Sequence, residues 1–106
     1  MSNLEKFNQT LFVSLGSQID TERFIQYSRN EQFEELRKPR GFVYYQVQNL
    51  KEASELCQEF IKFYDLGSSS WIGGRVIDNE NNFIAMVSYN GRLWKSEKFP
   101  SEEIIL

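Results

Sequence analysis

The period of the hydrophobic pattern changes near Gly41, from helix-like spacing before it to strand-like spacing after it. Near the N-terminus, apolar residues recur at three- and four-residue steps, at Leu4, Phe7, Leu11, Phe12 and Leu15. This spacing predicts a helix that ends near Gly16, and β-compatible residues between 10 and 15 leave a short strand as the alternative. We therefore expect an N-terminal helical region.

A second helix is expected to begin near Thr21 behind an Asp20 cap. Its apolar side is irregular, so we expect a break near residues 28–30, and Pro39 ends it. The aromatic and β-branched run at residues 42–47 then predicts a strand.

The most regular helical pattern covers residues 50–65. Asn49 and Glu52 have the spacing of a capping box, and Gly67 is expected as a left-handed C-cap. One apolar stripe joins Leu50, Ala53, Leu56, Cys57, Phe60, Ile61 and Tyr64. This stripe predicts a helix packed on a sheet, with a partner-binding helix as the alternative.

The remaining chain predicts an antiparallel meander of three strands, over residues 71–78, 83–89 and 92–97. The polar residues 79–82 form the first turn, and Asn90-Gly91 forms the second. A two-residue type I′ turn at Asn-Gly places Val87 opposite Trp94.

That register predicts two apolar faces for the meander. One face would carry Val76, Ala85, Val87, Tyr89 and Trp94. The other would carry Ile77, Ile84, Met86 and Leu93, beside Arg75 and Lys95. Helix 50–65 can cover only one face, so the N-terminal helices or a second subunit would have to cover the other.

These elements predict an α+β fold over residues 1–106 as a single small domain: an N-terminal helical region, then β-α-β-β-β. The sheet would be mainly antiparallel, with about four strands packed on helix 50–65. The pattern does not fix where strand 42–47 lies in the sheet. The apolar end, Ile104-Ile105-Leu106, is expected to dock on the domain, with insertion into a neighbouring subunit as the alternative.

Composition limits the chemistry. The chain has nine Phe, five Tyr and two Trp but no His and one Cys, and its net charge is −3. Without His, the commonest general base and metal ligand is missing, and Cys57 lies on an apolar stripe, as a buried thiol would. We therefore expect no catalytic residues, no metal and no cofactor.

The N-terminus lacks the pattern of a secretory signal, and no run of about 18 apolar residues occurs, so neither export nor membrane insertion is expected. The single Cys57 fits a reducing compartment, which favours the cytoplasm.

The leading functional hypothesis is a noncatalytic interaction or regulatory module that forms a homodimer or binds another protein. Its interface would be the second sheet face, at Ile77, Ile84, Met86 and Leu93. The alternative is a binder of a small ligand or of single-stranded nucleic acid through Trp71, Arg75, Tyr89, Arg92 and Trp94. The acidic net charge disfavours nucleic acid. A cofactor-free enzyme ranks third.

Overall fold

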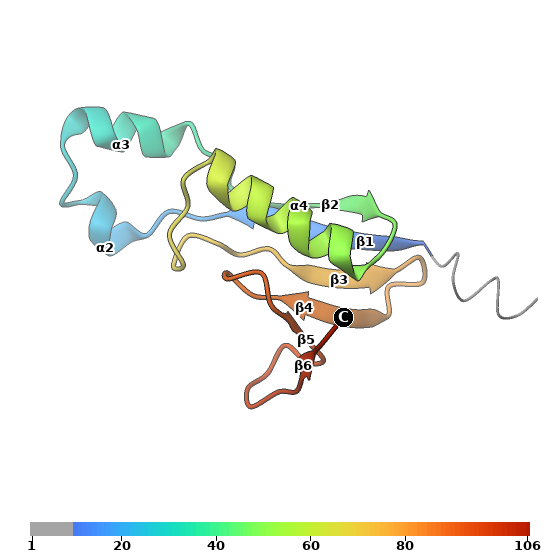
Figure 1. The fold of residues 1–106 in the computed structure, drawn as a ribbon. Helices are drawn as coiled ribbons and strands as arrows, with labels where there is room; N and C mark the ends of the chain where they lie inside the picture. Colours follow the sequence, from blue (N-terminus) through green and yellow to red (C-terminus); the bar gives the residue numbers. More distant parts are fainter. Residues whose placement is uncertain (1–9) are drawn as a thin grey trace, which may run out of the picture.

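The computed structural model describes residues 10–106, and Figure 1 shows one antiparallel sheet with a long helix across one face. In chain order the elements are β1 (Leu11–Ser17), α2 (Thr21–Phe24), α3 (Arg29–Leu36), β2 (Gly41–Val47), α4 (Leu50–Phe63), β3 (Arg75–Asp78), β4 (Phe83–Val87), β5 (Leu93–Trp94) and β6 (Glu103–Ile104). The sheet order is β2-β1-β3-β4-β5-β6. The α+β class is confirmed, with six strands in place of about four.

The helix predicted over the first apolar residues is wrong where the structure describes them, and the alternative of a short strand at residues 10–15 is confirmed, because Leu11–Ser17 is strand β1. Leu11, Val13 and Leu15 belong to the hydrophobic core, and every residue of β1 except Phe12 is buried. β1 lies between β2 and β3 and pairs with both, which a helix here could not do. Leu4 and Phe7 of the predicted helix lie outside the described residues.

The predicted strand at 42–47 is confirmed as β2, and the structure places it beside β1 rather than beside the meander. The pairing extends from Leu11 opposite Val47 to Ser17 opposite Gly41. Gly16 permits this approach, since a Cβ there would overlap the backbone and side chain of Phe42. β2 is therefore an edge strand of the sheet.

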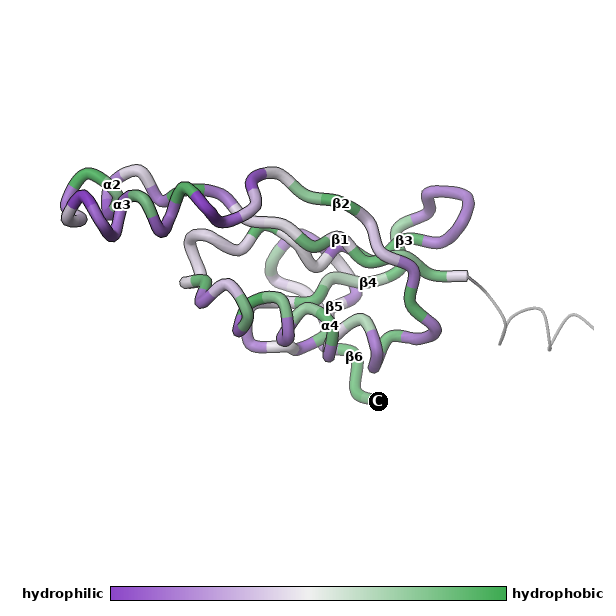
Figure 2. Tube along the Cα trace, turned by 90° about the horizontal axis from the view of Figure 1, so that it is seen from above, coloured by the Kyte–Doolittle hydropathy of each residue, from purple (hydrophilic) through white to green (hydrophobic). Residues whose placement is uncertain are grey.

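Between β1 and β2 the chain forms an arm, defined here as α2 and α3. Asp20 caps α2 as predicted, and Ser28 starts α3 with a capping box, so the predicted break is also confirmed. Figure 1 shows the arm projecting beyond the end of the sheet, and neither helix buries a residue. Purple predominates along the arm in Figure 2, and such polar helices have little reason to pack on a sheet. The expectation that these helices cover the second sheet face is therefore wrong.

Helix α4 is the element that covers the sheet. The Asn49 side chain accepts a hydrogen bond from the Glu52 N–H at 2.8 Å, which confirms the predicted cap. Ala53, Cys57 and Ile61 are buried at its sheet-facing side. Figure 2 shows α4 on one side of the sheet, and no element of residues 10–106 lies over the opposite side.

The predicted C-cap at Gly67 is wrong, because the left-handed residue after α4 is Asp65, with φ of 50°. The next N–H, that of Leu66, donates to the carbonyl of Ile61 at 2.9 Å, and Leu66 is buried. The helix thus closes before the chain reaches Gly67.

The meander is present, with shorter strands than predicted. Trp71 makes only an isolated bridge with Ser17, and β3 begins at Arg75. The turn at residues 79–82 is confirmed. There the Asp78 carboxylate accepts the N–H of Glu80 at 2.8 Å and that of Asn82 at 2.9 Å.

The predicted register of the β4–β5 hairpin is wrong by one residue. Met86, rather than Val87, lies opposite Trp94, and Val87 lies opposite Leu93. The Gly91 N–H donates to Ser88 O at 2.8 Å, and only Gly91 of the Asn-Gly pair has a positive φ, 85°. These are the features of a three-residue loop that ends in a left-handed glycine. The shift turns Leu93 toward the core, where it is 4% exposed.

The C-terminal segment docks on its own sheet, as expected, through β6. Ile104 lies opposite Leu93 and packs on the core, whereas Ile105 and Leu106 are exposed. Within residues 10–106 no helix has the length and apolar character needed to cross a bilayer.

Candidate functional site

The sheet face opposite α4 carries a row of side chains across three strands. Arg75 of β3 lies opposite Met86 of β4, which lies opposite Trp94 of β5. Their neighbours Val76, Ala85 and Leu93 face α4 and are buried. Arg75, Met86 and Trp94 therefore share the uncovered face.

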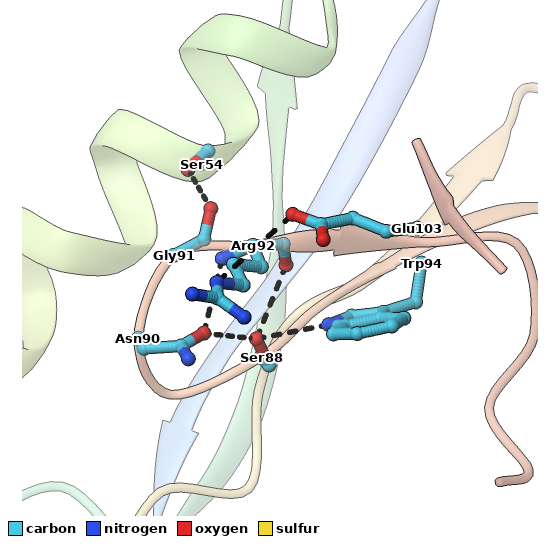
Figure 3. Close-up of polar contacts among 7 residues, drawn as sticks. All are labelled: Ser54, Ser88, Asn90, Gly91, Arg92, Trp94 and Glu103. Carbon is cyan, nitrogen blue, oxygen red and sulfur yellow. Dashed lines mark hydrogen bonds and ion pairs between the residues drawn. The ribbon is translucent and has the colours of Figure 1, made fainter. Parts of the chain in front are cut away.

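Trp94 is held in place by its own hairpin (Figure 3). Its indole N–H donates to Ser88 Oγ at 3.1 Å, and Ser88 also contacts Asn90 Oδ1 at 2.5 Å. The ring of Phe99 meets it edge-on, with centroids 5.5 Å apart. On the other side, Ser54 of α4 donates to the carbonyl of Gly91 at 2.6 Å. These contacts fix the indole at the rim of the sheet.

The arginines of the predicted ligand site are paired within the chain. Arg75 lies 3.1 Å from Glu97 and above the ring of Phe83, 5.6 Å from its centroid. Arg92 lies 4.0 Å from Glu103, as Figure 3 shows. A paired guanidinium attracts a phosphate less strongly than a free one. Ligand or nucleic-acid binding stays a prediction to which the geometry adds no support.

The other two residues of that predicted site lie apart from this face. Tyr89 donates its hydroxyl to the carbonyl of Leu66 at 2.7 Å, beyond the end of α4. Trp71 packs against the core beside Phe60, with ring centroids 6.0 Å apart, and its buried indole nitrogen has no hydrogen-bond partner. The structure therefore places Arg75 and Trp94 on one face with Met86 between them, pairs Arg92 with Glu103 of β6, and separates Trp71 and Tyr89 from this face.

The four residues of the predicted interface are divided between the two faces. Leu93 is in the core, and Ile84 packs against it because a bulge pairs Ile77 with Phe83 and leaves Ile84 unpaired. Ile77 is nearly buried, at 8% exposure, and Met86 lies on the uncovered face. They do not form one continuous surface: the face assignment made from the sequence holds for Ile77 and Met86 and is wrong for Ile84 and Leu93.

The largest cluster of exposed apolar side chains in β-structure is on β2, which the sequence did not identify as a site. Phe42 is 55% exposed, Val43 56%, Tyr44 38% and Tyr45 49%. Alternation places Val43 and Tyr45 on the α4 side of the sheet and Phe42 and Tyr44 on the opposite side. β2 thus presents apolar groups on both faces, and its seven residues, GFVYYQV, include no charge.

Within residues 10–106, no strand pairs with the outer side of β2. In β1, the carbonyl of Ser14 accepts from Gly74 at 2.8 Å and that of Gly16 from Ile72 at 3.4 Å. The even-numbered residues of β1 therefore turn toward β3 and the odd-numbered ones toward β2, since one residue's N–H and C=O point the same way. By the β1–β2 register, the residues of β2 that direct these groups out of the sheet are Phe42, Tyr44 and Gln46.

The one thiol of the chain is not reactive. Cys57 is fully buried under the sheet, and burial raises its pKa to about 12. It stays protonated at neutral pH, as expected for a core residue. Among residues 10–106, no group of three or more potential metal-ligating side chains lies together.

These features define an α+β protein with a sheet that is covered on one face and ends in an exposed aromatic edge strand. Comparisons with protein-family models, with curated proteins and with solved structures find no match.

Proposed function

We propose that this chain is a noncatalytic protein-interaction module that associates with a second copy of itself through β2. The observation that carries the proposal is the exposure of Phe42, Val43, Tyr44 and Tyr45 on the two faces of one edge strand. Long apolar edge strands without charges bind other strands readily, and proteins usually protect them.

The exposed apolar area of β2 is large enough to contribute to an interface. Phe42, Tyr44 and Tyr45 are each between 38% and 55% exposed. Since a buried aromatic side chain covers about 150–250 Å², the three rings leave about 300 Å² per copy in water. Val43 and the strand backbone add to this, so a dimer would approach the lower limit of about 1,000 Å² for specific interfaces. We therefore expect association of moderate strength.

Self-association was also expected from the sequence, but through a different surface. The surface is now β2 rather than the meander, because Leu93 and Ile84 contribute to the core. We also propose that the protein works in the cytoplasm, since its single thiol is buried and free. Cell fractionation would test this, and recovery only from an oxidising compartment would contradict it.

Sedimentation velocity on the native chain tests self-association. Between about 1 µM and about 500 µM, we expect the weight-average mass to rise from that of the monomer toward twice that value. The mass of one chain is 12.6 kDa. A mass that stays at 12.6 kDa over the whole range would contradict the proposal.

A further inference from the structure

We infer that two copies pair β2 with β2 in antiparallel fashion about a two-fold axis at Tyr44, which joins their sheets into one continuous sheet. This inference rests on the proposed function and specifies its geometry.

The outward backbone groups of β2 determine the register of the pairing. Phe42, Tyr44 and Gln46 direct their N–H and C=O groups out of the sheet. An axis at Tyr44 places Tyr44 opposite the partner's Tyr44 and Phe42 opposite the partner's Gln46. Every outward group then has a partner. An axis at Val43 or at Tyr45 would leave the outward groups of one of these residues unpaired in each copy.

The side chains of β2 are compatible with the same register. An axis perpendicular to the sheet keeps each face on its own side, so aromatic groups meet aromatic groups. On the uncovered face, the partner's Tyr44 would join the edge-on pair of Phe42 and Tyr44, whose centroids are 5.7 Å apart. On the α4 side, Val43 would lie beside the partner's Tyr45. Aromatic and β-branched residues are favourable cross-strand pairs.

The two edges of the sheet differ in a way that selects β2. The opposite edge, β6, is only two residues long. Beside it, Glu102 binds Lys95 at 2.8 Å and Glu103 faces Arg92. Short, charged edges resist pairing, whereas β2 is long and has no charge. Joining at β2 therefore leaves only protected edges on the assembled sheet.

The partner strand at the β2 edge is that of a second copy rather than that of another protein. The edge is complementary to itself, because all its outward groups pair under one rotation and no like charges come opposite one another. In such a dimer, each copy also covers the exposed aromatic rings of β2 in the other copy. A different partner strand would need a matching pattern that nothing on this chain specifies.

Directed cross-linking tests the axis. Tyr44→Cys places two thiols opposite each other, with Cα atoms about 5.5 Å apart, which is within disulfide range. We expect a covalent dimer under mild oxidation that reducing agent reverses. Met86→Cys is the matched control, because it lies on the same face two strands away from β1. Cys57 gives no background, since it is buried.

A backbone variant tests the hydrogen bonds. Gln46→Pro removes one outward N–H and leaves the β1–β2 ladder intact, which proline permits on an edge strand. We expect its dimer dissociation constant to rise by about tenfold or more, whereas Gln46→Ala keeps the N–H and stays closer to native. Circular dichroism at low concentration checks that the monomer is folded.

The outcomes separate the two proposals. A native chain that stays monomeric contradicts both. If the native chain dimerises but Tyr44→Cys cross-links no better than Met86→Cys, the β2 geometry is wrong while self-association stands. The cross-linking result decides the geometry even if Gln46→Pro fails to fold.

Discussion

At the scale of single residues, Asp20 joins two segments that are distant in the sequence. Its carboxylate accepts from the Ser69 hydroxyl at 2.7 Å and from the Arg23 N–H at 3.3 Å, so it both caps α2 and binds the loop after α4. These hydrogen bonds, that from Ser69 first, lower the pKa of Asp20 below its ordinary value. The ionised carboxylate of Asp20 thus holds the start of the arm against the loop that follows α4.

The sign of the pH effect follows from this shift. A lowered pKa in the folded state means that Asp20 contributes stability above its ordinary pKa, near 3.8, and that this contribution is lost as the pH falls through the lowered value. We expect Ser69→Ala to raise the pKa of Asp20 toward normal, as measured by NMR titration of the carboxyl carbon. Glu31 is the internal control, because Ser28 lowers its pKa in a separate capping box. An unchanged Asp20 pKa in the variant would contradict this assignment.

At the scale of elements, two glycines that the sequence suggested as left-handed have different roles. Gly91 has a φ of 85°, and a Cβ there would come within 3.2 Å of the Gln58 side chain. Gly67 is not among the positive-φ residues, and the nearest atom to its added Cβ is Arg23 Nη1, at 3.7 Å. Of these two positions, only Gly91 in the hairpin therefore requires glycine.

We expect Gly91→Ala to lower the free energy of unfolding by about 1–2 kcal/mol, since L-residues are strained at positive φ. Gly67→Ala should be neutral or stabilise by up to about 1 kcal/mol, because it restricts the unfolded chain. Urea denaturation of both variants at one low protein concentration measures the difference. Equal losses in the free energy of unfolding for the two variants would mean that Gly67 is the left-handed C-cap of α4 after all.

Elements with strong local signals could be predicted from the sequence. Asn49 and the apolar stripe identified α4 because capping and helical periodicity depend on neighbours in the chain. β1 could not be separated from a helix, because its strand conformation depends on pairing with β2 and β3. The loop at Asn90-Gly91 was predicted one residue short, since a left-handed glycine serves both two- and three-residue loops.

The candidate site was harder to predict, for a reason that lies in the sheet order. The sequence identified β2 as an aromatic strand, but only the order β2-β1-β3-β4-β5-β6 makes it an edge. The one-residue error in the hairpin moved Leu93 and Trp94 to the wrong faces, which changed the predicted surface.

At the scale of the whole molecule, one helix covers one face of a six-stranded sheet, and the arm extends away from it (Figure 1). Among the strands of residues 10–106, the exposed large apolar side chains all lie in β2 at one edge, while the other edge is short and charged. This asymmetry is the physical basis for association through one edge of the sheet.

Amide hydrogen exchange along β2, measured by NMR at dilute and at high protein concentration, tests this pairing most directly. The N–H groups of Val43, Tyr45 and Val47 bond to β1 and should be protected at both concentrations. Those of Phe42, Tyr44 and Gln46 should exchange rapidly when dilute and become protected as the chains associate. Rapid exchange of these three amides in a sample that is demonstrably dimeric would contradict pairing through β2.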